Sequence, residues 1–144
     1  MYRLFAYGSL ICEDIMYAVA GPCGQLGRAR LLHHRRLAVK GEHYPGMIAA
    51  PGFSVDGMVY QGIDAAGLAR LDRFEGDMYQ RLPVQVELAD GRQLDVFSYL
   101  VRDAWRDQLT TRDWLLEEFL QRGKQAFTDA YLGFGRIPGE DEQP

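Results

Sequence analysis

Residues 68–88 read LARLDRFEGDMYQRLPVQVEL, and this stretch carries the signals of a helix, a stop and a strand in succession. Asp64 precedes it and is a preferred residue at the start of a helix, so we expect a helix from Asp64 to about Glu75. Gly76 supplies the stop, because glycine readily adopts the left-handed backbone that ends a helix. From residue 84 to residue 88 apolar and polar side chains alternate, which predicts a strand with one buried face.

The remaining segments predict more strands than helices. Asp90-Gly91 is the strongest hairpin signal in the chain and predicts a return strand over residues 94–101. Proline-glycine pairs at 45–46 and 51–52 predict a loop over residues 43–53. The other expected elements are a strand at 2–7, a helix at 13–20, strand structure at 26–39 with a turn near His33-His34, a strand at 55–63, and a long helix from Thr110 to about Leu132. Together they predict an α+β fold whose sheet is curled or barrel-like, with the helices outside.

Gly57 interrupts the apolar face of the strand expected at 55–63. Val55, Val59 and Ile63 share that face, whereas Gly57 has no side chain at the position where a strand normally carries one. A glycine inside a strand is typical of a place where another backbone or a ligand comes close. We therefore expect a close approach at Gly57.

Length and composition restrict the possible classes of protein. The chain has 144 residues, of which 47% are hydrophobic and 25% charged, and these values exclude a wholly disordered chain. We expect one domain over residues 1–137, followed by a polar tail at 138–144 that reads PGEDEQP. The net charge of -4 makes nucleic acid an improbable partner, because neutralising phosphates supplies most of that affinity.

Cysteine usage and the N-terminus predict where the protein works. Cys12 and Cys23 match no zinc-ligand spacing, so we interpret them as buried or half-buried free thiols. The first seven residues, MYRLFAY, contain neither the long apolar region nor the cleavage site of a secretory signal. No apolar run is long enough to span a bilayer, which makes a membrane partner unexpected. These features predict a cytoplasmic protein with reduced thiols.

Glu75 is a candidate for a proton-transferring carboxylate. With 100° per residue, Glu75 falls about 20° from Leu68 and so lies on the inward stripe of the predicted helix, together with Leu71. Its position in the last helical turn places the carboxylate near the negative end of the helix dipole. Apolar neighbours and the dipole both raise the pKa of a carboxyl group, as general acid–base chemistry near neutral pH requires.

Periodicity alone does not separate Glu75 from Asp72. Asp72 falls about 40° from Leu68 on the same projection, so it is nearly as inward as Glu75. Either side chain could also be an ordinary solvated or ion-paired carboxylate at the end of a helix. At this point the pattern leaves both residues open.

The second candidate feature is the turn Tyr7-Gly8-Ser9-Leu10, which follows the first strand directly. A strand that ends in Gly-Ser and leads into a helix can direct several backbone N–H groups at one point and so bind a carboxylate or a phosphate. The turn lacks the length and the lysine of a P-loop, the third glycine of a dinucleotide fingerprint, and the frame of a nucleophile elbow. A plain strand-to-helix connection remains the alternative interpretation.

Taken together, these segments resemble the gamma-glutamylcyclotransferase-like (AIG2-like) family. The matching pieces, in the family's order, are FAYGSL at 5–10, YPGM at 44–47, VDGMVYQGID at 55–64, LARLDRFEGDMYQRLPVQVEL at 68–88 and VFSYLV at 96–101. They cover most of residues 2–101. The combination of YGSL with LDRFEG, followed by a tyrosine and an arginine, is specific for this family. The resemblance implies a mixed β-barrel with flanking helices, a single domain, and a cavity at one end. The segment after Thr110 looks like the family's variable C-terminal part.

The resemblance also implies an activity and a set of site residues. The activity would be cyclisation of a γ-glutamyl amine, amino acid or peptide to 5-oxoproline, with release of the amine. Glu75 falls on the family's catalytic glutamate, which would act as general acid and base and favours Glu75 over Asp72. No metal and no cofactor are implied, because the nucleophile belongs to the substrate. By position, the substrate's α-carboxylate would be bound by the backbone of Tyr7, Gly8, Ser9 and Leu10, with supporting roles for Tyr79, Arg81 and Tyr99.

Two other functions remain open at this stage. The anion-binding turn could serve a noncatalytic module that binds a small carboxylate, or Glu75 could activate water in an amide hydrolase. The basic run from Arg28 to Lys40 is expected to be a solvated strand face, and the alternative is a rim that attracts anionic substrates.

Overall fold

A ring of five strands forms the centre of the molecule. The computed structural model describes residues 1–131. The ring follows the order β3-β1-β5-β4-β2, and a further pairing of β2 with β3 closes it. β1 pairs with β5 in parallel, and the other strand pairs of the ring are antiparallel, which makes the barrel mixed. The strands are β1 (Tyr2–Ala6), β2 (Gly24–Val39), β3 (Pro45–Ile63), β4 (Tyr79–Leu88) and β5 (Gln93–Val101). The predicted α+β barrel in a single domain is confirmed.

Alternating side chains of the ring fill the barrel with an apolar core. Phe5 and Val59 are paired across β1 and β3 and are both almost fully buried. Gly57 lies in β3, where a Cβ atom would collide with the Ala6 carbonyl oxygen and the Phe5 ring. The predicted close approach at Gly57 is therefore confirmed, and the neighbour is another backbone. The core cluster inside the barrel comprises Phe5, Tyr7, Ala29, Leu31, Met47, Val55, Val59, Val86, Leu88 and Val96.

The predicted loop at 43–53 and the predicted turn at His33-His34 are both wrong. β2 and β3 run through these positions as long paired strands, with Leu32 opposite Ser54 and His34 opposite Ala49. His33 thus faces the four residues 50–53, and this bulge carries the positive φ angles of His33 (60°) and Gly52 (88°). Proline lacks an N–H donor, so it is tolerated in a strand at a bulge or at the first residue. Pro51 occupies the bulge and Pro45 begins β3, so the proline-glycine pairs mark strand irregularities.

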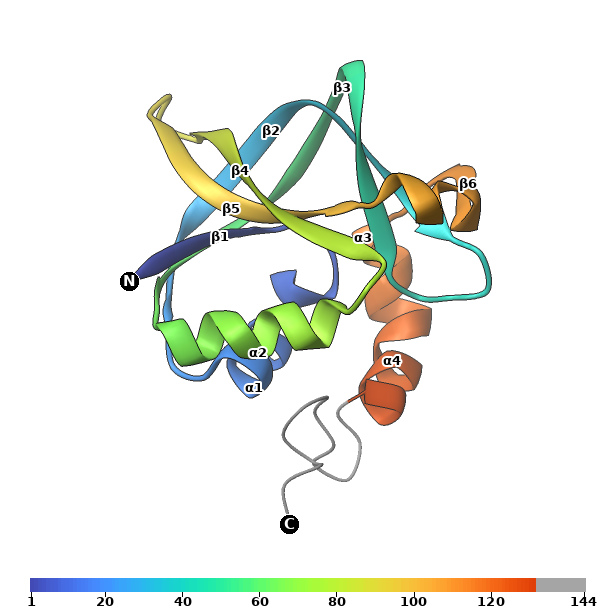
Figure 1. Cartoon of the computed structure of the whole chain (residues 1–144), viewed down its shortest axis with the longest axis horizontal. Coiled ribbons are helices and arrows are strands. Elements are labelled where there is room, and N and C mark those ends of the chain that lie inside the picture. Colours follow the sequence, from blue (N-terminus) through green and yellow to red (C-terminus); the bar gives the residue numbers. More distant parts are fainter. Residues whose placement is uncertain (132–144) are drawn as a thin grey trace.

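Two helices that pack against each other cover one end of the barrel (Figure 1). They are α1 (Glu13–Ala20) and α2 (Ala65–Glu75), as predicted. The Asp64 side chain accepts a hydrogen bond from the Gly67 backbone N–H at 2.7 Å and caps α2, and Gly76 ends the helix with a φ of 78°. A Cβ atom at Gly67 would collide with the Ala20 carbonyl oxygen, so the absence of a side chain lets α1 and α2 approach closely. Within residues 1–131, no helix is long and apolar enough to cross a membrane.

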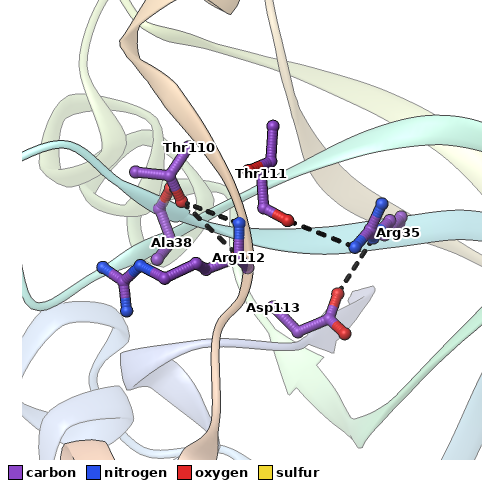
Figure 2. Close-up of polar contacts among 6 residues, drawn as sticks. All are labelled: Arg35, Ala38, Thr110, Thr111, Arg112 and Asp113. Carbon is purple, nitrogen blue, oxygen red and sulfur yellow. Dashed lines mark hydrogen bonds and ion pairs between the residues drawn. The ribbon is translucent and has the colours of Figure 1, made fainter.

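Residues 109–113 form a further strand, which contradicts the predicted helix start at Thr110. β6 (Leu109–Asp113) follows the 3-10 helix η2 (Asp103–Gln108) and pairs with the outer edge of β2. Figure 2 shows that the Thr110 hydroxyl donates to the Ala38 carbonyl at 2.8 Å, while Asp113 pairs with Arg35 at 2.9 Å. Thr110 followed three residues later by Asp113 fits the pattern of a helix cap, but both side chains instead contact β2, which is far away in sequence.

The C-terminal helix begins at Leu116 and is irregular. It consists of α3 (Leu116–Glu118), the π-helical turn η3 (Phe119–Gly123) and α4 (Lys124–Tyr131). The 100° spacing of an α-helix predicts one inward stripe, which consists of Leu116, Phe119, Leu120, Gly123, Phe127 and Ala130. Phe119, Gly123 and Phe127 are buried, whereas Leu120 is 48% exposed. The wider π-turn shifts the inward face relative to the 100° spacing of an α-helix, so the predicted stripe is correct only in part. The predicted helix end at Leu132 and the domain boundary before the tail at 138–144 lie outside the described residues.

Candidate active site

The candidate active site is a pocket at the helix-covered end of the barrel. It lies where β1 passes into the turn at 7–10 and where the end of α2 meets the barrel. The pocket encloses about 340 Å³ of space, including its open mouth. Its wall consists of residues 4–6 of β1, the turn at 7–10, Tyr44, Pro45, Glu75, Tyr79 and Tyr99. The two features that the sequence singled out, the turn and Glu75, thus line one cavity.

The turn at 7–10 lines this pocket and contains backbone N–H groups that the turn itself does not use. The turn closes with two hydrogen bonds, from Ile11 N to Gly8 O at 3.0 Å and from Cys12 N to Ser9 O at 3.1 Å. Within residues 1–131, these bonds leave the N–H groups of Gly8, Ser9 and Leu10 without a backbone acceptor. Ser9 and Leu10 are buried, and such N–H groups in a buried turn can bind a carboxylate.

Gly8 is required because the turn is in close contact with Pro45. A Cβ atom at Gly8 would lie 2.8 Å from both Cγ and Cδ of the Pro45 ring, a distance that a rigid ring cannot relieve by a rotamer change. Pro45 is the first residue of β3 and is itself part of the pocket wall. The close contact holds the turn against the opposite wall of the pocket.

Glu75 is the last residue of α2, and its half-buried side chain lines the pocket. Burial, and in second place the negative charge of Asp72, raise the pKa of the Glu75 carboxyl group to about 8. Within residues 1–131, no donor forms a hydrogen bond with this carboxyl group. A carboxyl group with these properties is available to a ligand and can gain or lose a proton near neutral pH.

Asp72 has different surroundings, although it lies only one turn earlier on α2. It accepts hydrogen bonds from Arg81 Nε at 2.9 Å and from the Tyr99 hydroxyl at 2.7 Å. Its side chain is 42% exposed, and Asp72 does not line the pocket. The two carboxylates that were equivalent on the helical projection are therefore separated by their partners: Asp72 is paired, and Glu75 faces the pocket.

The tyrosine hydroxyl groups around the pocket are used in structural hydrogen bonds. The Tyr7 hydroxyl donates to the Tyr99 carbonyl at 2.6 Å, and the Tyr79 hydroxyl donates to the Pro45 carbonyl at 2.6 Å. Burial is the main cause that raises the pKa of Tyr7, Tyr79 and Tyr99, so these phenols stay protonated. They connect the turn after β1 to β5, and β4 to β3, and so fix the shape of the pocket.

A family comparison agrees with this geometry. The family model for gamma-glutamyl cyclotransferase, AIG2-like, matches residues 4–116, which include the turn, both carboxylates and the barrel except for the first two residues of β1. The chain belongs to this family. The match ends at Leu116, so residues 117–131 of this AIG2-like chain, including most of its C-terminal helix, lie outside it.

Individual relatives give the same picture. AIG2-like protein C of Arabidopsis thaliana is 32% identical over 141 residues, covering 95% of this chain and 81% of that relative. AIG2-like protein D of the same plant is 38% identical over 90 residues, and there the match spans 62% of this chain but only 59% of the relative. A solved structure described as a gamma-glutamyl cyclotransferase superimposes with a TM-score of 0.63 over 70% of this chain and 66% of that one. With 23% sequence identity, this last likeness shows the fold.

The predicted supporting residues of this AIG2-like chain divide into two groups. Tyr79 and Tyr99 line the pocket, as the four residues of the turn and Glu75 do. Arg81 lies outside it, where its guanidinium group binds Asp72 and stacks 4.7 Å from the centre of the Phe97 ring. Arg81 therefore binds Asp72, the carboxylate that neighbours Glu75, and is not part of the pocket wall.

Sequence reasoning missed two contributions to the site. Tyr44 lies in the connection before β3, as predicted, but it also lines the pocket next to Pro45, and its place in the YPGM piece was the available signal. Arg36 was counted in a solvated basic face, but it is half-buried and its Nη1 donates to the Tyr7 carbonyl at 2.8 Å. No local pattern distinguishes Arg36 from Arg30, which forms an exposed ion pair with Asp56 at 2.8 Å.

Possible metal ligands are scattered over the molecule. Among residues 1–131, no three His, Cys, Asp or Glu side chains come together in a way that could hold a metal ion. Cys12 and Cys23 are free and half-buried, as predicted. Among the described lining residues of the pocket, Glu75 is the one with a carboxyl group.

Proposed function

We propose that this AIG2-like chain is a γ-glutamyl cyclotransferase that converts a γ-glutamyl amine, amino acid or peptide to 5-oxoproline. The observation that carries the proposal is that a proton-exchanging carboxyl group and a turn with free N–H groups line the same pocket. The turn would hold an anion, and the carboxyl group would move a proton. A γ-glutamyl compound needs both, because it carries a free α-carboxylate beside the α-amine that reacts.

The reaction requires one bond to form and one to break. The α-amine nitrogen attacks the γ-carbonyl carbon of the same substrate, and the bond between that carbon and the leaving nitrogen then breaks. Because the attack is intramolecular, correct orientation of the substrate supplies as much as about 7–11 kcal/mol of the barrier reduction. The protein therefore has to fold the substrate, which binding of the α-carboxylate by Gly8, Ser9 and Leu10 would do.

Glu75 would carry the proton between the two nitrogens. The substrate's ammonium group must lose a proton before it attacks, and the leaving nitrogen must gain one before it departs. A bound ammonium group favours the charged form of Glu75, so the carboxylate can accept the first proton although the pKa of the free protein is raised to about 8. The pKa of the resulting carboxylic acid is high enough for the acid to form readily. It is also low enough for the acid to donate its proton to the leaving nitrogen.

The test is a mass-spectrometric screen of γ-glutamyl amines, amino acids and peptides with the wild-type chain and Glu75→Gln. We expect at least one compound to give 5-oxoproline, and Glu75→Gln to lower that rate by about 10²–10⁴-fold. Asp95→Asn, an exposed carboxylate on β5, is the matched control and should keep the wild-type rate. Normal turnover by Glu75→Gln would refute the mechanism. Free glutamate in place of 5-oxoproline would indicate hydrolysis, and binding without any product would indicate a noncatalytic module.

A further inference from the structure

A second cavity adjoins the pocket and shares Glu75 with it. This outer groove offers about 630 Å³ of space, the open solvent at its mouth included. Besides Glu75, the two cavities have Ser9, Tyr44 and Tyr79 in common, so they adjoin each other at the end of α2. A substrate that is held by its α-carboxylate in the inner pocket, with its reacting carbonyl at Glu75, would extend its leaving amine into the outer groove.

Aromatic rings form the wall of the outer groove. Phe74 precedes Glu75 on α2, and its ring lies 6.0 Å from the ring of Phe127 and 6.4 Å from that of Tyr131, both edge-on. Tyr44, which immediately precedes β3, lies with its ring centre 6.1 Å from that of Tyr131. Phe127 and Tyr131 pack at 4.8 Å from each other. We call these four residues the aromatic wall, and all four line the groove.

The aromatic wall depends on the part of the chain that the family match leaves out. Phe127 and Tyr131 belong to α4 (Lys124–Tyr131), whereas the family match ends at residue 116. The inner pocket consists entirely of matched residues, from Leu4 to Tyr99. The inner pocket is thus built from the segment that matches the family, whereas part of the groove is built from a segment outside that match. Such a division is expected where the family shares a reaction step and each member has its own substrate specificity.

The charges of the groove exclude one class of leaving group. Among its described lining residues, the acidic groups are Glu75 and Asp77, and there is no lysine or arginine. Asp77 is exposed at the rim of the groove. A carboxylate on the leaving amine would find no cation among these described residues and would be repelled by Asp77, whereas an uncharged ring or alkyl chain would find apolar and aromatic surface.

We propose that the outer groove binds the leaving amine, and that the aromatic wall selects γ-glutamyl amines with an uncharged aromatic or alkyl body over γ-glutamyl amino acids. This inference rests on the cyclotransferase activity proposed above and adds the chemical class of its leaving group.

Three synthetic substrates test the groove with the full-length chain. γ-Glutamylphenethylamide and γ-glutamylphenylalanine have the same ring and differ by one carboxylate, and γ-glutamylethylamide lacks the ring. We expect kcat/KM for the phenethylamide to exceed that of each of the other two by about tenfold or more. Equal or greater kcat/KM for γ-glutamylphenylalanine or for the ethylamide would overturn the inference.

Two variants connect the selectivity to named residues. Tyr131 is half-buried at the groove, so Tyr131→Ala should remove ring surface and lower the ratio of phenethylamide to ethylamide kcat/KM at least about threefold. Asp77→Lys should raise kcat/KM for γ-glutamylphenylalanine, because it replaces a repelling charge by an attracting one. Phe53→Ala is the matched control: Phe53 is a 47% exposed aromatic residue in the bulge of β3, and its removal should leave both ratios unchanged. Unchanged ratios in both test variants would overturn the assignment of the groove.

Failure of this inference is distinguishable from failure of the proposed function. If the substrates are cyclised without the expected preference, the groove assignment is wrong and the activity stands. If none is cyclised, the activity is wrong. Titration calorimetry with Glu75→Gln then still gives the Kd of the phenethylamide and of the ethylamide. Tighter binding of the phenethylamide supports the groove assignment, and equal binding refutes it.

Discussion

Asp72 and Glu75 lie one turn apart on α2, and the charge of Asp72 raises the pKa of Glu75 while Asp72 itself is held by Arg81 and Tyr99. The paired carboxylate stays at the edge of the site, and the unpaired one faces the pocket. One short helical segment thus carries both the carboxyl group that lines the pocket and the charge that raises its pKa. The predictions below follow from this pair and from the turn that faces it.

The pH dependence of the reaction should follow Glu75. In the free protein its pKa is raised to about 8, so below that pH the carboxyl group is protonated and cannot accept the proton of the substrate's ammonium group. We expect kcat/KM to rise with pH through about 8 and to fall again where the free substrate loses its own ammonium proton. Initial rates of 5-oxoproline formation from about pH 5 to about pH 10 measure this profile, because that range spans both titrations. A rate independent of pH across the rise would contradict the role of Glu75.

Asp72→Asn should move that profile toward acid. The substitution removes the negative charge that contributes to the raised pKa of Glu75, while burial, the larger cause, remains. The midpoint of the rise in kcat/KM is therefore expected at lower pH than in the wild type, but still above the ordinary glutamate value of 4.5. Asp95→Asn, on the exposed face of β5, should leave the midpoint where it is. A shift in the alkaline direction would show that the charge of Asp72 does not act on Glu75.

Glu75→Gln should stabilise the protein at neutral and alkaline pH. The pKa of Glu75 rises from 4.5 to about 8 on folding, so the folded state favours the protonated form. The free energy of unfolding of the wild type therefore falls as pH rises from about 4.5 to about 8, and glutamine avoids this loss. We expect the variant to be more stable by on the order of 1–3 kcal/mol above pH 8, discounted for partial exposure of the side chain, and about equal below pH 4.5. Urea denaturation across this range measures the difference, and a gap independent of pH would argue against a titrating Glu75.

Gly8→Ala should damage the site more than the fold. The new Cβ atom would lie 2.8 Å from the Pro45 ring, so the turn must move away from the position that presents its N–H groups. A displacement of this kind should lower kcat/KM by about 10–100-fold, mainly through KM, because the α-carboxylate is no longer held correctly. Gly24→Ala is the matched control, since nothing lies within 4 Å of a Cβ atom there. Circular dichroism checks that both variants keep the barrel, and an unaffected KM in Gly8→Ala would remove the turn from the binding site.

The sequence could predict those parts of the fold that are decided locally. The Asp64 cap and the Gly76 stop act on groups only a few residues away, they set the position of Glu75, and the structure confirms both. Gly57 was also recognisable, because the apolar face of a strand normally carries a side chain at every second residue. The resemblance then selected Glu75 over Asp72 where the helical projection could not.

The failures arose where distant contacts overrule local preference. Pro51-Gly52 is a turn signal, but the long pairing of β2 with β3 absorbs it as a bulge. Thr110 and Asp113 resemble a helix cap, but they bind Ala38 and Arg35, which lie 72 and 78 residues away along the chain. The π-turn at 119–123 and the role of Arg36 likewise depend on tertiary packing that no short window contains.

The pairing of β1 has a consequence for biosynthesis. Residues 2–6 are made long before their partners in the ring, which are β3, ending at Ile63, and β5, where Phe97 is the residue opposite Leu4. Contacts so distant along the chain form slowly and only after the later strand has been made. The turn at 7–10 therefore reaches its place beside the barrel only after β5 has been synthesised, and any ligand-dependent rescue of a folding-defective variant must act after that moment.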